Sequence, residues 1–389
     1  MRNLHPLWLT LLLLLSAGLA GGLVATDAQP LPGASDNRAP MQATKDVTAA
    51  PSAQHAQATT GHPRLWITAA DLGRLRTWTV DSNPLYKEGL AVLAANAKND
   101  MDAGRVPNQD EGGTTWDQYP SEMYAQLFAF LSLVENDPVT RADYAQRART
   151  VLMHVINEAA KGAAPGQPFR DAAFSTSDRS RWWGEGFALT VDWIYPTLSA
   201  QDKTTIRQVF LRWAQENHNA STTDYNHPEP QNVYSDTDLL ADPVRVRWSA
   251  NNYYQAHARN MGLMALAFDA ADDPGGQLWA YVQEAASAWL YVTDDLLRNY
   301  ARGGLSPEGF EYGPDALGFT AQFLLALHTA GQDDAAAWGR QVVWTDNPFW
   351  RATLPAYMHS LSPAPTTYAD FDWLGPVYQP TWFGDGQDF

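Results

Sequence analysis

Four segments of the sequence are almost entirely apolar, and each is followed by a tight turn and a more polar helical segment. The apolar segments are 124–131, 186–193, 262–268 and 319–327. A helix that is apolar on every side must be surrounded by protein, whereas an amphipathic helix keeps one face in water. The repeat returns every 60–75 residues or so, roughly twice the TPR period. The pattern predicts an all-α fold of helical hairpins in two layers, an incomplete (α/α) toroid. A generic helical bundle is the alternative.

The hydrophobic spacing and the turn residues give the expected helices. A helix is expected to begin at Asp71, and Pro84 is expected in the first turn of the next one. Ser199 is a predicted N-cap, with Asp202 three residues later. The remaining expected helices are 119–136, 138–160, 184–197, 200–218, 250–271, 276–300, 315–331, 333–344 and 347–360.

Two long stretches, 162–183 and 219–249, interrupt the helical pattern and are rich in Pro, Asp, Asn, Arg and Trp. Long loops in a compact domain are more often functional than idle. In a ring of hairpins they would gather at one mouth, and we expect them to build a cleft there.

The N-terminus is typical of a secretory signal peptide. Arg2 precedes a continuous apolar run over 7–20, and small residues follow as far as Ala28. An uncleaved membrane anchor is the alternative. Residues 29–60 lack a hydrophobic period and predict a disordered linker. The expected organisation is therefore a signal peptide over 1–28, a linker over 29–60 and one toroid domain over 61–389, in a secreted or periplasmic protein.

Charge and composition narrow the partners. The formal net charge is −17, which opposes binding to nucleic acid and to anionic membrane surfaces. There is no cysteine, so disulfides and thiolate metal sites are excluded. The chain holds 16 Trp, 16 Tyr and 14 Phe, which suit either a large core or aromatic faces for sugar rings. No metal site, cofactor or stable membrane insertion is expected, and the sequence carries no signal for oligomeric state.

Four motifs resemble one family in its own order. These are HPRLWITAADLGRLR at 62–76, GFALTVDWIYPTLS at 186–199, NNYYQAHARNMG at 251–262 and GLSPEGFEYG at 304–313. They are similar to motifs of the heparinase II/III-like and alginate-lyase-like polysaccharide lyases, whose toroid domain the chain resembles over roughly residues 62–345. The family usually carries a β-sandwich after the toroid, which we expect to be absent or truncated in this sequence.

The resemblance implies β-elimination of a uronate-containing polysaccharide. That reaction needs a base, an acid for the leaving oxygen and a group that neutralises the uronate carboxylate. On this interpretation Tyr312 is the acid and also a candidate base, and Asn252 or its neighbour Asn251 neutralises the carboxylate. His257 is a third catalytic candidate. It lies five residues beyond Asn252, so it would line the cleft only in an irregular helix.

Further residues are candidates for substrate binding. Arginines can pair with carboxylates and tryptophans can stack on sugar rings, although each alone is more often a surface charge or a cover of the core. Glu308 is expected to organise its loop rather than act as a catalyst. The candidates are Arg181, Arg247, Trp182, Trp248, Glu308 and Asn251, together with Arg179, Arg245, Arg302 and Trp183 in or beside the unusual loops.

Two other functions fit the same sequence. A glycoside hydrolase would need two carboxylates across the scissile bond. The candidates for that pair are Glu308, Glu311, Asp315 and Asp117. A non-catalytic carbohydrate-binding protein would bind oligosaccharides without turnover.

Overall fold

The computed structural model describes residues 61–113, 118–162, 169, 174–220, 239–367 and 375–380, without the side chain of residue 245. The described residues all belong to the unit His55–Phe389, the larger of the two units into which the chain divides. The expected signal peptide and linker lie outside the described residues.

The described chain is mostly helical, at 69% helix and 2% strand, which confirms the all-α class. The helices are α2 (Ala69–Trp78), α3 (Ala91–Asp102), α4 (Ser121–Val134), α5 (Pro138–Ala160), α6 (Asp178–Trp183), α7 (Glu185–Trp193), α8 (Ala200–Asn219), α9 (Pro243–Trp248), α10 (Asn252–Leu266), α11 (Trp279–Glu284), α12 (Leu290–Asp295), α13 (Gly313–Thr329), α14 (Ala335–Trp338) and α15 (Phe349–His359).

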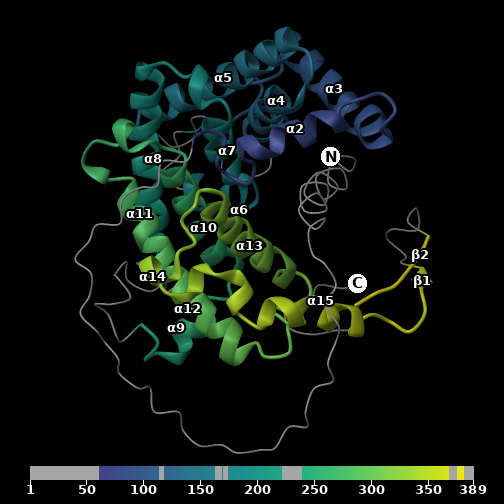
Figure 1. Cartoon of the computed structure of the whole chain (residues 1–389), viewed down its shortest axis with the longest axis vertical. Helices are drawn as coiled ribbons and strands as arrows, with labels where there is room; N and C mark the ends of the chain where they lie inside the picture. The colour runs from purple at the N-terminus through teal and green to yellow at the C-terminus, as the bar shows by residue number, and fades with distance from the viewer. Residues whose placement is uncertain are drawn as a thin grey trace, which may run out of the picture. The chain divides into compact units, whose positions relative to one another are not determined.

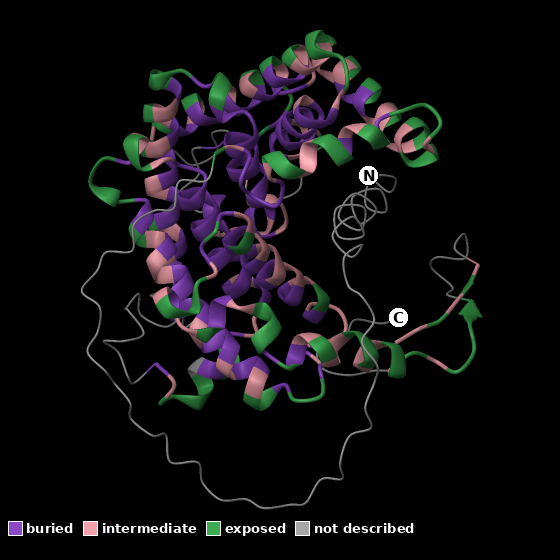
Figure 2. Cartoon of the chain, viewed as in Figure 1, coloured by how far each residue is buried: buried purple, intermediate pink, exposed green. Residues whose placement is uncertain are grey.

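The apolar helices form a row through the body (Figure 1). Helix α4 packs on α7, α7 packs on α10, and α10 packs on α13. Every residue of α7 is buried, and in α10 only Tyr253 is not. The sequence of α7 is largely apolar on all sides because protein surrounds that helix. Helix α10 is as deeply buried although it carries polar residues such as Gln255, His257 and Arg259, and Figure 2 shows the burial of the central helices.

The amphipathic helices form the second layer. Helix α5 packs on α4 and α8, and α8 packs on α10. Only one stripe of α5 and of α8 is buried, so their other faces stay in water. The predicted cap of α8 is confirmed: the Asp202 amide donates to Ser199 Oγ at 3.1 Å, and the Ser199 amide donates to Asp202 Oδ2 at 2.9 Å.

The N-terminal strap, residues 62–67, ties two central helices together. The amide of Leu65 donates to Asp192 Oδ2 of α7 at 2.8 Å. The indole of Trp66 donates to the Gln322 carbonyl of α13 at 2.9 Å. A segment at the start of the body thus holds helices that lie 128 and 256 residues further along the chain.

Four stretches differ from the sequence predictions. The expected helix 276–300 is interrupted by π-helical turns at Ala285–Trp289 and Leu296–Tyr300. The expected helix 333–344 ends at Trp338, because Gly339 has a φ of 101°. The stretches expected as loops contain α6 and α9, which are each six residues long. Periodicity cannot reveal so short a helix, since it spans less than two turns.

The C-terminal described part leaves the helical layers. After α15 come two short antiparallel strands, β1 (Thr366–Thr367) and β2 (Pro376–Val377). Within the described ranges, no helix combines the length and the apolar character needed to cross a bilayer.

Candidate functional site

Three elements meet at the N-terminus of α10. They are α6, the first turn of α10 and the loop 304–312 that leads into α13. Gly184, which ends α6, permits this close approach: a Cβ there would lie 2.1 Å from Nδ2 of Asn260 on α10. The residues predicted from separate motifs are therefore brought into one place.

Arg181, Asn252 and Glu308 form a continuous hydrogen-bonded chain. Arg181 Nη1 donates to Asn252 Oδ1 at 2.7 Å. Asn252 Nδ2 donates to Glu308 Oε1 at 2.7 Å, and the Asn252 backbone amide donates to the same oxygen at 2.9 Å. The amide of Asn252 is thereby held in one orientation, with its oxygen toward the cation and its nitrogen toward the carboxyl.

The Arg181 guanidinium is buried, at 8% exposure, among three aromatic rings. It lies 4.8, 4.4 and 5.7 Å from the ring centres of Trp182, Tyr253 and Tyr312. Its Nη2 group pairs with Asp178 at 3.0 Å, and the Tyr253 hydroxyl donates to the same carboxylate. Its Nε has no hydrogen-bond partner among the described residues, so one donor of a buried cation is unused.

Two carboxyl groups near Arg181, those of Glu308 and Asp315, have pKa values above the ordinary range of carboxyl groups. Burial raises the pKa of Glu308 to about 7, although Asn252 and Arg181 oppose the shift. Burial also raises the pKa of Asp315 to about 6, against the effect of Arg181. Glu308 Oε2 is buried without a hydrogen-bond partner in the described chain. This corner can therefore hold or release protons near neutral pH.

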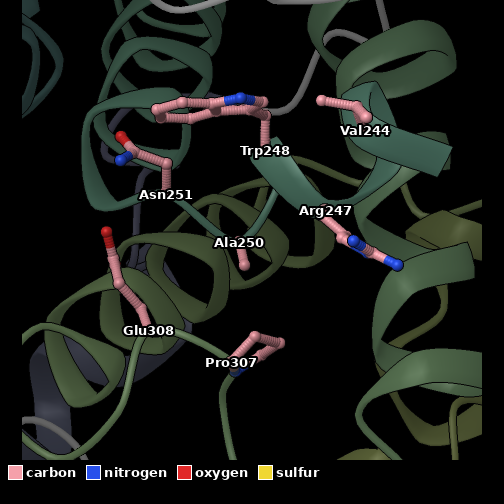
Figure 3. Close-up of a pocket in the computed structure, with 7 residues that line it drawn as sticks. All are labelled: Val244, Arg247, Trp248, Ala250, Asn251, Pro307 and Glu308. Atoms are coloured by element: carbon pink, nitrogen blue, oxygen red, sulfur yellow. The ribbon is translucent and has the colours of Figure 1, made fainter. Parts of the chain in front are cut away.

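A shallow pocket of about 340 Å³ adjoins this chain (Figure 3). It is lined by Val244, Arg247, Trp248, Ala250, Asn251, Pro307 and Glu308. The Glu308 side chain points toward Asn251, and Arg247 extends toward the opposite end (Figure 3). Asn251 Oδ1 accepts from the Tyr253 amide at 2.9 Å, so the N-cap of α10 is Asn251 and not Asn252.

His257 lies inside the protein and does not line the pocket. Helix α10 is continuous through it, and the side chain is 0% exposed. Burial, assisted by Arg259 and Arg181, lowers its pKa to about 3, so the imidazole is neutral. The irregular helix that a catalytic His257 required is absent from α10, and the imidazole cannot touch a bound substrate in this conformation.

Arg179 differs from a second expectation: an arginine of this kind was expected to be a surface charge, but the side chain is buried. It is 0% exposed, and it donates from Nε and Nη2 to the two oxygens of Glu122 at 2.8 and 2.7 Å. It also donates to Asp110 Oδ2 at 2.7 Å. Burial opposes the charge, but the two carboxylates outweigh it and raise the pKa of Arg179. Its carboxylate partners belong to the protein.

Trp182, which lies beside the Arg181 guanidinium, and Trp183 are both half-buried. The Trp182 ring also lies 6.1 Å from that of Phe319. Arg302 is exposed. The Arg245 side chain and Asp117 are outside the described residues.

Sequence reasoning missed Asp178 and Tyr253, which both contact Arg181. A weak signal existed for each. Asp178 stands three residues before Arg181, which is the spacing of a helical ion pair, and Tyr253 follows Asn252 directly. The helical spacing could not be applied to Asp178 and Arg181, because the sequence predicted a loop over 162–183. Without a position for Arg181, nothing connected it to Tyr253.

No protein-family model matches this sequence, and no curated protein matches it. Among the described residues, no group of three or more histidines and carboxylates is arranged to hold a metal ion.

Proposed function

We propose that the protein is a polysaccharide lyase that cleaves a uronate-containing polysaccharide by β-elimination. The observation that carries this proposal is the placement of Asn252 and Tyr312 on the same guanidinium, that of Arg181. An amide, a cation and a phenol are the groups that this reaction needs together.

The proposed chemistry begins with the uronate carboxylate. Arg181 and the amide of Asn252 neutralise it, which makes the proton on the neighbouring ring carbon more acidic. Tyr312, as phenolate, takes that proton, and the electron pair forms a carbon–carbon double bond as the glycosidic C–O bond breaks. The same phenol then returns the proton to the leaving oxygen. The products are one fragment with a new reducing end and a second fragment with an unsaturated uronate at its non-reducing end.

We also propose that the hairpins belong to an incomplete (α/α) toroid and that the protein is exported. The toroid is supported by the contacts in sequence order along the row α4, α7, α10 and α13, with α5 and α8 outside it. Export is supported by the apolar run over 7–20 behind Arg2. The substrate partner is an acidic polysaccharide.

A glycoside hydrolase is the second candidate, and the raised pKa values favour it specifically. Glu308 at about 7 and Asp315 at about 6 are the kind of carboxyls that protonate a leaving oxygen. On this alternative the second carboxylate activates water, and Tyr312 is dispensable.

Product analysis separates these functions. The protein is incubated with a panel of uronic-acid polymers, and near-ultraviolet absorbance and new reducing ends are measured together. A lyase gives both signals, and Tyr312→Phe lowers the rate by about 100-fold or more. Tyr300→Phe, at an exposed tyrosine, is the matched control and keeps the wild-type rate.

Two outcomes contradict the lyase proposal. New reducing ends without near-ultraviolet absorbance, lost in Glu308→Gln but kept in Tyr312→Phe, identify a hydrolase. Oligosaccharide binding without either signal on any polymer identifies a non-catalytic binding protein.

A further inference from the structure

The pocket beside Glu308 combines features that the reaction centre alone does not use. It has an apolar platform, since the Trp248 indole is 36% exposed and faces the pocket. It has a polar end, since Glu308 and Asn251 both line it. It also has an exposed cation, Arg247. Figure 3 shows Glu308 and Arg247 at opposite ends of the pocket, with Trp248 along one side.

Arg247 differs from most arginines of this acidic protein. Arg179, Arg181 and Arg259 each pair with a carboxylate. Arg247 makes no ion pair with any residue that the structure describes. In a chain of net charge −17, an exposed arginine without a carboxylate partner is a local exception to a repulsive field. Such a group suits an anionic ligand, which it can hold by charge-assisted hydrogen bonds.

Glu308 connects the pocket to the Arg181 centre. Its Oε1 accepts from Asn252, and the residue also lines the pocket. Asn251 lines the pocket as well, whereas its neighbour Asn252 is hydrogen-bonded to Arg181. The pocket and the Arg181 centre are therefore joined by Glu308 and by two consecutive residues of the chain.

We propose that this pocket is a binding subsite for a second uronate of the same chain, next to the scissile bond. The sugar ring stacks on Trp248, its carboxylate pairs with Arg247, and its hydroxyl groups face the polar end formed by Glu308 and Asn251. The proposal rests on the proposed function for the identity of the acidic sugar. It adds that the enzyme recognises two acidic units through two separate arginines, Arg181 and Arg247.

Calorimetric binding tests the subsite without relying on turnover. The full chain carrying Tyr312→Phe is titrated with tetrasaccharides of mannuronate, of galacturonate and of the glucuronate–N-acetylglucosamine repeat. Each tetrasaccharide is compared with its carboxyl-reduced form. Mass spectrometry after each titration verifies that the sugar is intact. Arg247→Gln and Trp248→Ala are added to this background, and circular dichroism verifies that each variant is folded.

The expected result is a ratio of affinities. At least one acidic tetrasaccharide binds about tenfold or more tightly than its reduced form, and Arg247→Gln loses about tenfold for the acidic form alone. Trp248→Ala weakens both forms by about tenfold, because stacking does not depend on the carboxylate. Arg351→Gln and Trp344→Ala, at an exposed arginine and an exposed tryptophan outside the pocket, bind like the background protein.

The subsite is overturned if Arg247→Gln keeps the full preference for the acidic form, if Trp248→Ala binds like the background, or if no tetrasaccharide binds. The lyase proposal fails separately, through the products formed by the wild-type protein. Binding that depends on Arg247 without an unsaturated product keeps the subsite and rejects the lyase.

Discussion

Arg179 and Arg181 stand two residues apart on α6, but they differ in how much negative charge surrounds each guanidinium. Arg179 is enclosed by Glu122 and Asp110, and its guanidinium lies 4.8 Å from the ring centre of Phe169. Arg181 meets one carboxylate, Asp178, whose side chain is 44% exposed, and one neutral amide. The first arginine is matched with more negative charge than it carries. The second has one carboxylate partner, and that carboxylate is half-exposed.

The contrast separates a cation whose charge the protein compensates in full from one that it compensates in part. A cation between two buried carboxylates is neutralised by the protein itself, and removing it leaves both carboxylates buried without a counter-charge. A cation that meets one half-exposed carboxylate and a neutral amide is compensated less completely. Both arginines look alike in the sequence, so only their partners distinguish them.

The largest expected effect is on folding. Arg179→Met leaves two buried carboxylates without a cation and should lower the free energy of unfolding by about 3–5 kcal/mol. Arg181→Met should lose less than half as much, because only a half-exposed carboxylate and an amide lose a partner. Urea denaturation measures both. Equal losses would break the distinction between the two arginines.

A smaller effect is expected in the pH dependence at Glu308. Its pKa is about 7 in the folded protein and 4.5 as the ordinary value, so the folded state binds the proton more tightly. The stability that this provides is complete below pH 4.5 and is lost as the pH rises through about 7. The total is on the order of 3 kcal/mol.

Glu308→Gln removes this titration, so its unfolding free energy should fall less than that of the wild type between pH 4.5 and 7. The difference between the two proteins isolates Glu308 from Glu122 and Asp315, which titrate in both. Glu88→Gln, at an exposed position, should follow the wild-type curve. Parallel curves for Glu308→Gln and wild type would show that the carboxyl is not strained by burial.

The smallest effect on stability is expected at Asp178, the half-exposed partner of Arg181. Asp178→Asn should change the free energy of unfolding by less than about 1 kcal/mol, since the Asp178 side chain is 44% exposed and water replaces much of its interaction. The matched change Glu122→Gln, at the buried partner of Arg179, should cost several times more. Thermal or urea unfolding of the two variants would sharpen the comparison. A large loss for Asp178→Asn would place Arg181 among the structural cations.

The sequence predicted long helices better than short ones. The limits of α5 agree with prediction because Asp137 caps it and Pro138 occupies its first turn, both local signals. Helices α6 and α9 have only six residues, and contacts with other parts of the chain stabilise them. The π-helical turns within 276–300 likewise leave the apolar spacing almost unchanged, so periodicity did not reveal them.

The site was also predicted only in part, because contacts between distant parts of the chain leave no local signal in the sequence. Tyr312, Asn252 and Glu308 were chosen from motifs, and the structure brings them together around Arg181, while their roles stay predictions. The burial of Arg179 could not be seen, because its partners Glu122 and Asp110 lie 57 and 69 residues away in the chain. His257 was a candidate by residue type, and only the regular course of α10 places it inside.

The strap over 62–67 has a consequence for how the molecule is assembled. Its bonds to Gln322 and Thr329 require a part of the chain that the ribosome makes more than 250 residues later. Trp66 therefore cannot make these contacts until α13 has been synthesised. The strap is among the first parts of the body to be synthesised, and its hydrogen bonds to α13 are among the last that synthesis allows.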